Sequence, residues 1–214
     1  MSLTGRNLTC TRGDTTVFTG LDFDIAPGDI VVVRGANGSG KSSLLRLAAG
    51  YLAPTEGELR RDGVPIADDP ERHRTSLHYV GHLDALKPAL SVAENLAFWS
   101  RVLAPKTPAS SRLGHDRTLD RMGLSGLADV PTRYLSAGQR RRLALARLIV
   151  CSRPLWLLDE PTASLDDAGT ETLLGLISDH RSNGGMVLAA VHGSIAVDDA
   201  VTIRLGECRM DGMS

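Results

Sequence analysis

The chain has 214 residues, enough for one globular domain, and its 42% hydrophobic and 23% charged residues exclude a disordered chain. Its 24 basic and 25 acidic residues give a formal net charge of −1, so nonspecific attraction to nucleic acid or anionic lipid is not expected. No apolar run reaches the ~18 residues that span a bilayer, no signal-peptide core is apparent, and three widely spaced cysteines indicate free thiols in the cytoplasm: Cys10, Cys151 and Cys208.

Predicted strands occupy both ends of the chain. Thr15–Phe18 and Leu21–Ile25 carry β-branched and aromatic residues in partial alternation, which predicts a small antiparallel sheet. Three all-apolar runs, each preceded by turn residues, are typical of parallel strands buried on both faces: Ile30–Val33, Leu155–Leu158 and Met186–Val191.

Apolar residues at helical spacing predict helices at Lys41–Ala49, Ser91–Val102 and Ala137–Val150, with Ser136 as the N-cap of the last. Leu103–Ser111 is expected to be a loop inside this helical region. The layout predicts a single α/β domain over residues 1–214. It consists of a parallel-sheet core with a small antiparallel subdomain (residues 1–87 and 151–214) and an inserted helical subdomain (residues 88–150).

A glycine-rich loop directly follows the predicted strand Ile30–Val33 and leads into a helix. It fits the pattern Gly, four residues, Gly-Lys-Ser, in which backbone N–H groups and a helix N-terminus surround nucleotide phosphates. Lys41, one of only three lysines, would reach the β- and γ-phosphates, and the Ser42 hydroxyl would supply one Mg²⁺ ligand. The residues expected to contact the nucleotide are Gly35, Ala36, Asn37, Gly38, Ser39, Gly40, Lys41, Ser42 and Ser43.

Two acids end the predicted strand Leu155–Leu158. In enzymes with this kind of loop, an acid in the position of Asp159 binds Mg²⁺ through water. Glu160 is then placed to act on the attacking water as a base or an orienting group. Together with the loop, the pair predicts nucleotide hydrolysis.

Leu135-Ser136-Ala137-Gly138-Gln139, followed by three arginines and an apolar helix, resembles the signature motif of ATP-binding cassette (ABC) proteins, with alanine where glycine is usual. Ser164-Leu165-Asp166 resembles the D-loop, and His192, which ends the strand Met186–Val191, resembles the switch histidine. The motifs keep the family's order, and the resemblance spans about residues 2–206. It implies an α/β phosphate-loop ATPase fold, ATP as the nucleotide, and Glu160 and His192 as catalytic residues.

The family resemblance also implies partners. Two copies pair head to tail, and each ATP lies between one phosphate loop and the signature residues of the second copy: Leu135, Ser136, Ala137, Gly138 and Gln139. Ser136 and the helix N-terminus after it would contact the γ-phosphate in trans. Closure, hydrolysis and reopening would drive integral membrane subunits through their cycle.

The chain departs from the family pattern at two positions. The family stacks adenine on an aromatic residue where this chain has Arg12; a guanidinium also stacks on bases, and Phe18 is the alternative. His82 stands at the position of the Q-loop glutamine, where a neutral imidazole still binds Mg²⁺ or water. The expected metal ligands are therefore Ser42, Asp159 and His82.

The segment Gly81-His82, Lys87, Leu90-Ser91 and Glu94–Phe98 resembles the ATPase subunits of cytochrome c maturation haem exporters. This implies haem export or haem-chaperone release at the cytoplasmic face of the inner membrane, with membrane subunits and without nucleic acid as partners. An ABC transporter of a different solute is the alternative. Cassettes that act on nucleic acid usually carry tandem cassettes or long insertions, and a non-hydrolysing module would need neither Glu160 nor His192.

The stretch from His82 to Phe98 is expected to receive a short helix of a membrane subunit, as in the family. Within it, the residues predicted to line an exposed groove are Leu83, Leu86 and Leu90. The residues predicted to pack the core are Val92, Leu96 and Trp99. The alternative is that all six fill the helical subdomain.

Overall fold

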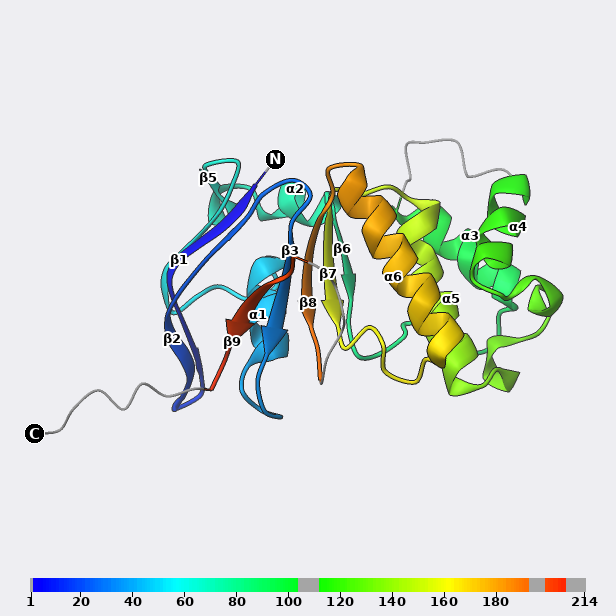
Figure 1. Cartoon of the computed structure of the whole chain (residues 1–214), viewed down its shortest axis with the longest axis horizontal. Helices are drawn as coiled ribbons and strands as arrows, with labels where there is room; N and C mark the ends of the chain where they lie inside the picture. The colour runs from blue at the N-terminus through cyan, green and yellow to red at the C-terminus, as the bar shows by residue number, and fades with distance from the viewer. Residues whose placement is uncertain (1, 104–111, 193–198, 207–214) are drawn as a thin grey trace, which may run out of the picture.

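Two β-sheets organise the computed structural model, which describes residues 2–103, 112–192 and 199–206 (Figure 1). The first is antiparallel, with the strand order β2-β1-β4-β5. Its strands are β1 (Leu3–Arg12), β2 (Thr15–Ile25), β4 (Glu56–Arg61) and β5 (Val64–Pro65). The predicted antiparallel sheet is thus confirmed, but the two predicted segments form one strand that runs through Gly20 at φ +63°.

The second sheet is parallel, with the order β6-β7-β8-β3-β9. Its strands are β3 (Ile30–Arg34), β6 (Leu77–Val80), β7 (Leu155–Asp159), β8 (Met186–Ala190) and β9 (Val201–Arg204). The three predicted parallel strands are confirmed to within one residue, and β7 and β8 are buried along their whole length. The edge strand β9 escaped prediction because it is short and mostly exposed.

The helices are α1 (Lys41–Ala48), α2 (Pro70–Thr75), α3 (Val92–Leu103), α4 (Arg112–Arg121), α5 (Ala137–Val150) and α6 (Asp167–Ser182). Helix α5 has the predicted bounds and Ser136 as its N-cap. Helix α3 begins after Ser91, because the Glu94 backbone N–H donates to the Ser91 hydroxyl at 3.2 Å and makes Ser91 a cap. The predicted loop Leu103–Ser111 lies, beyond Leu103, outside the described residues.

The parallel sheet separates two apolar cores. Val31 and Val33 of β3 face a core with β1, β2 and α1, whereas Ile30 and Val32 face a core with α3, α5 and α6. In Figure 1, α1 accordingly lies between the two sheets, and α5 and α6 cover the opposite face, with α3 and α4 beyond. Because parallel strands share one carboxyl edge, the segments after β3, β6, β7 and β8 meet there. The predicted division of the chain at residues 87 and 150 stays a prediction.

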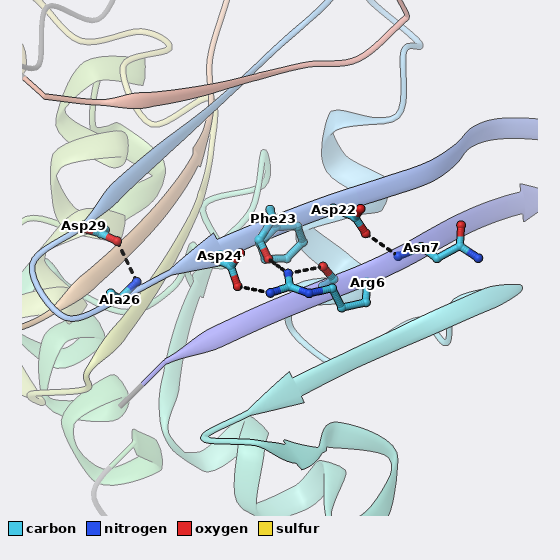
Figure 2. A network of polar contacts seen from close by, with 8 residues as sticks. Arg6, Asn7, Asp22, Phe23, Asp24, Ala26 and Asp29 are labelled. Carbon is cyan, nitrogen blue, oxygen red and sulfur yellow. Dashed lines mark hydrogen bonds and ion pairs between the residues drawn. The ribbon is translucent and has the colours of Figure 1, made fainter.

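Polar contacts hold β1 against β2 on the exposed side (Figure 2). The Arg6 guanidinium donates to the Asp24 carboxylate at 2.6 Å and to the Phe23 carbonyl at 3.0 Å. The Asn7 N–H donates to Asp22 Oδ1 at 2.6 Å. Exposed pairs of this kind add little stability. Farther along β2, Val17 lies beside Gly40 of the glycine-rich loop.

Candidate nucleotide-binding and hydrolysis site

The glycine-rich loop connects β3 to α1, as predicted. Gly40 has φ +98°, and a Cβ there would lie 2.3 Å from Val17 Cγ1, so the turn into α1 excludes a larger residue. The Lys41 ammonium folds back and donates to the carbonyls of Gly35 at 2.8 Å and Ala36 at 2.9 Å. The Ser39 hydroxyl is buried and has no hydrogen-bond partner among the described residues. A cation held over a tight loop with an unsatisfied donor fits a phosphate chain.

A cavity of about 250 Å³ opens at this loop. It is lined by Arg12, Val17, Asn37, Gly38, Gly40, Lys41, Ser42, Ser43 and Glu160. Arg12 ends β1 and enters the wall, whereas Phe18 is 9% exposed and belongs to the apolar core. This placement favours Arg12 over Phe18 for the adenine contact, which stays a prediction.

The acid pair follows β7 at the same sheet edge. The Asp159 side chain is buried at 4% exposure, and Glu160 takes the left-handed φ of +47° that turns its side chain into the cavity wall. The Glu160 N–H donates to the Ala190 carbonyl at 2.9 Å, which ties the turn to β8. The two carboxylates therefore face different cavities although they are adjacent in sequence.

Arg141 of α5, which sequence reasoning missed, supports this turn. Its guanidinium donates to the carbonyls of Asp159 at 2.9 Å, Glu160 at 2.7 Å and Pro161 at 3.3 Å. It also donates to the Gly81 carbonyl at 3.0 Å, next to His82, and contacts the Asp84 carboxylate at 3.4 Å. At 3% exposure this side chain fixes α5, the acid pair and the segment after β6 to one another. The only sequence signal was the run of three arginines, which did not show which one is buried.

His192 and the D-loop segment also meet the site. His192 follows β8, and its Nε2 donates to Oδ1 of Asn37 in the glycine-rich loop. Ser164 has φ +65°, and a Cβ on Gly138 would lie 2.8 Å from the Ser164 carbonyl oxygen. The predicted signature and D-loop residues are therefore in close contact within the chain, and glycine is required at 138 for that approach.

Two of the signature residues are exposed on the surface. Leu135 is buried at 4% exposure, but Ser136 and Ala137 are exposed. The Gln139 N–H donates to the Ser136 hydroxyl at 3.2 Å and the Ser136 N–H donates to Gln139 Oε1 at 2.9 Å, a complete capping box. Within the described chain, these residues contribute nothing to the wall of the 250 Å³ cavity.

A second cavity, of about 610 Å³, lies beside the first, and Ser42 lines both. The three predicted metal ligands, Ser42, Asp159 and His82, all lie in its wall. A hydroxyl and a carboxylate are oxygen ligands that suit Mg²⁺, which takes its remaining ligands from water and phosphate, whereas an imidazole nitrogen is a poorer match. The described residues hold no cluster of three or more His, Cys, Asp or Glu side chains that could bind a metal alone. The donor set therefore fits Mg²⁺ held jointly with a nucleotide.

The predictions for the segment after β6 hold in part. Leu83 is 79% exposed and lines the 610 Å³ cavity, and Val92 and Leu96 are buried as predicted. Leu86 instead packs against the core. The core prediction for Trp99 was wrong: it lines the cavity, and the Arg147 guanidinium lies over its ring at 5.2 Å.

The two cysteines in the described part of the chain, Cys10 and Cys151, are free, and Cys208 lies outside it. None of the helices that the structure describes combines the length and the apolar character that crossing a bilayer requires.

Comparisons with known proteins agree with this geometry. Residues 18–163 match the ABC transporter family. Curated relatives named cytochrome c biogenesis ATP-binding export protein CcmA share 47% identity in Paramagnetospirillum magneticum, over 96% of this chain and 94% of the relative. The relative in Bradyrhizobium diazoefficiens shares 48%, over 96% of this chain and 98% of its own length.

Solved structures show the same fold. CbiO1 from Clostridium perfringens, part of the ABC transporter complex cbiONQ, is 30% identical with a TM-score of 0.74, over 89% of this chain and 78% of its own. A dimeric ATP-binding cassette in a post-hydrolysis state with ADP and phosphate is 25% identical with a TM-score of 0.77, over 89% of this chain and 88% of its own.

Proposed function

The chain belongs to the ABC transporter family, and from that premise we propose that it is the ATP-hydrolysing subunit of a complex that serves cytochrome c biogenesis. The observation that carries the proposal is the near full-length similarity to relatives named for that process, combined with a complete phosphate loop, acid pair and signature segment. The enzyme converts ATP and water to ADP and phosphate. Its complex exports haem or releases a haem chaperone. Transport of a different solute is the alternative, because other chains would contact the solute.

The proposed roles in ATP binding follow from the cavity. The loop residues 35–43 surround the phosphates, and Lys41, already held over the loop, pairs with the β- and γ-phosphates. Arg12 stacks on the adenine. Ser42, Asp159 and His82 would hold Mg²⁺, which neutralises charge on the phosphates when bound.

Glu160 and His192 are the proposed catalytic residues. The Glu160 carboxylate lies in the wall of the cavity, where it accepts a proton from the attacking water or orients that water. His192 contacts Asn37 of the phosphate loop, which supports a role for its imidazole at the terminal phosphate. Arg141 positions Glu160 through the backbone and does not touch the substrate.

We propose that the site is completed by a second copy of the chain in a head-to-tail dimer. The support is that Ser136 and Ala137 are exposed and do not reach the cavity of their own chain. The N-terminus of α5 would then meet the γ-phosphate held by the other copy. The dimeric relative of the same fold is consistent with this arrangement.

The chain would act as a peripheral protein on the cytoplasmic face of the inner membrane, bound to integral membrane subunits. The support is the family, whose transporters need membrane-spanning parts, and the printed role of the relatives in export.

The decisive experiment replaces the curated relative in a bacterium that requires it for c-type cytochromes. The wild-type chain should restore haem-stained c-type cytochromes, and Lys41→Ala should not, because the phosphates lose their cation. Arg60→Ala, which removes an exposed basic side chain of β4 that pairs with Glu58 away from the loop, is the control and should still restore them.

If the wild-type chain hydrolyses ATP but restores no c-type cytochrome with its own membrane subunits present, the alternative solute is favoured. If Lys41→Ala binds ATP normally in equilibrium dialysis, the assignment of the phosphate loop is wrong.

A further inference from the structure

The segment that leads into the signature residues is paired with a distant part of the chain. Residues 130–133 lie antiparallel to residues 88–92 and share backbone hydrogen bonds with them. The Thr132 N–H, for example, donates to the Leu90 carbonyl at 3.0 Å. Because a single helical turn separates Thr132 from Ser136, this pairing attaches the signature segment to the residues just before α3.

Asn95 of α3 holds the turn at residues 87–91 from inside, and it is fully buried at 0% exposure. The Lys87 N–H donates to Asn95 Oδ1 at 2.8 Å, and Asn95 Nδ2 donates to the Lys87 carbonyl at 3.1 Å. Nδ2 also lies within hydrogen-bond distance of the carbonyls of Leu90 at 3.2 Å and Ser91 at 3.0 Å. A buried amide that is satisfied on both sides fixes the shape of this turn.

Thr132 ties the signature segment to the same turn. The residue is 1% exposed, and its hydroxyl donates to the Lys87 carbonyl at 2.9 Å. That carbonyl also accepts from Asn95, so both of its lone pairs are used. Thr132, Asn95 and the Lys87 backbone thus form one buried polar network, and a network whose members are satisfied is rigid.

Ser136 is attached to the rest of the chain from both directions. Within the signature turn, the capping box with Gln139 sets the local shape of the backbone. After Ser136, Gly138 lies against the Ser164 carbonyl. Before Ser136, the buried network makes the attachment through Thr132. The place of Ser136 therefore depends on both attachments.

We propose that Asn95 and Thr132 are positioning residues, which hold Ser136 where it meets the nucleotide bound to a second copy of the chain. The inference rests on the proposed head-to-tail dimer and names what sets the place of its signature residues. A misplacement of ~1 Å can cost ~10²-fold in rate, so a rigid attachment has a function here.

The two positioning residues act through Ser136 and not on the nucleotide of their own chain. Neither Asn95 nor Thr132 is among the described residues that line the 250 Å³ cavity. The loss of either side chain should therefore spare ATP binding by an isolated copy. It should impair the formation of the dimer and the turnover of ATP.

The first test replaces Thr132 with valine, which keeps the shape of the side chain and removes the hydroxyl. In equilibrium dialysis, at a concentration too low for the dimer, Thr132→Val should bind ATP like wild type. In the Glu160→Gln background ATP should drive dimer formation, and light scattering should show that Thr132→Val needs at least ~5-fold more ATP, the factor that one hydrogen bond supplies. With Glu160 in place, turnover at saturating ATP should fall by a similar factor.

Two further variants separate position from stability. Thr132→Ser keeps the hydroxyl and should dimerise and turn over like wild type. Thr118→Val removes another buried hydroxyl, which donates to the Gly114 carbonyl of its own helix at 2.9 Å. It should melt below wild type by about as much as Thr132→Val, because each variant loses one buried hydrogen bond. It should nevertheless dimerise and turn over like wild type.

Asn95→Asp tests the other member of the network. The carboxylate keeps an acceptor for the Lys87 N–H, but it has no donor for the Lys87 carbonyl. Turnover should fall by at least ~10-fold, because a buried acceptor loses its donor, while the isolated chain still binds ATP like wild type. A variant that does not fold or binds no ATP would show that Asn95 serves the fold alone, and its positioning role would be wrong.

Equal behaviour of the two valine variants would overturn the proposal. If Thr132→Val and Thr118→Val dimerise and turn over alike, the Thr132 hydroxyl contributes stability and not position. Loss of ATP binding by the isolated Thr132→Val chain would also overturn it, since the effect would then lie in the chain's own site. If the chain with Thr132 intact forms no dimer with ATP, the proposed head-to-tail dimer is wrong as well, which distinguishes failure of the proposed function from failure of this inference.

Discussion

Helix α5 carries two buried arginines whose surroundings differ. Arg141 is 3% exposed and donates to four backbone carbonyls of two other segments. Arg147 is 6% exposed, and among the described residues its guanidinium contacts the Trp99 ring and makes no hydrogen bond or ion pair. A buried cation stabilises a fold when its donors are satisfied and destabilises it when they are not. The first arginine is therefore expected to stabilise the fold, and the second to add little to its stability.

The contrast is tested most strongly by Arg141→Met. The change leaves buried carbonyls of the acid-pair turn without donors, so the free energy of unfolding should fall by about 3 kcal/mol or more. Arg147→Met is the matched change on the same helix and should alter that free energy by less than about 1 kcal/mol. Urea unfolding of the two isolated variants measures both values. Equal losses would show that burial alone, and not hydrogen bonding, decides what each arginine does.

The next largest effect is expected for the catalytic carboxylate in the turn that Arg141 supports. Glu160→Gln should lower the turnover of ATP by ~10²-fold, the range for loss of a positioned base, while ATP binding is kept. Glu171→Gln, an exposed acid of α6, is the control and should turn over like wild type. Steady-state phosphate release measures turnover. If the turnover of Glu160→Gln stays near that of wild type, Glu160 is not catalytic. Arg141 would then support a turn that has no part in hydrolysis.

The smallest expected effect is a pH dependence of the stability that arises from His78, which lines the 610 Å³ cavity together with Arg147. Burial lowers the pKa of His78 to about 3 in the folded chain, and the charges of Arg153 and Arg147 add to this, although a hydrogen bond to the Cys151 carbonyl opposes it. Because an unfolded histidine has a pKa of ~6.5, only the unfolded chain gains this proton just below that pH. The stability that neutral His78 contributes is complete above pH ~6.5 and is lost as the pH falls toward 3, with about 1 kcal/mol lost between pH 7 and 5.5.

His78→Gln should remove that dependence, which thermal melting from pH 7 to 5.5 would measure. The melting temperatures of wild type and variant should approach each other as the pH falls. Parallel curves would mean that His78 titrates normally in the folded chain and that the cavity wall is better hydrated than its burial indicates.

The sequence predicted those parts of the molecule that depend on local pattern. The buried strands around Ile30–Val33 have uniform apolar runs, and the Ser136 cap and helix α5 follow from residue type and spacing. The glycine-rich loop was found for the same reason, since its backbone conformation requires glycines at fixed positions.

The parts that sequence did not predict depend on contacts between distant segments. Nothing in the run of three arginines distinguishes Arg141, because its partners at Gly81 and at the acid pair lie 60 and 18 to 20 residues away. Trp99 shares a helical face with Val92 and Leu96, yet it lines a cavity, with the Arg147 guanidinium of α5 over its ring. Helical periodicity gives the face of a residue, but not whether the opposing helix offers an apolar or a charged side chain.

Ser42 belongs to the walls of both cavities, and this shared wall has a thermodynamic consequence. An occupant that shifts the Ser42 hydroxyl from one side changes the affinity on the other side. By linkage, the factor by which a partner in the larger cavity changes the dissociation constant of ATP must equal the factor by which ATP changes the dissociation constant of that partner. Through one hydroxyl, binding of the nucleotide would change the affinity for the partner, and binding of the partner would change the affinity for the nucleotide.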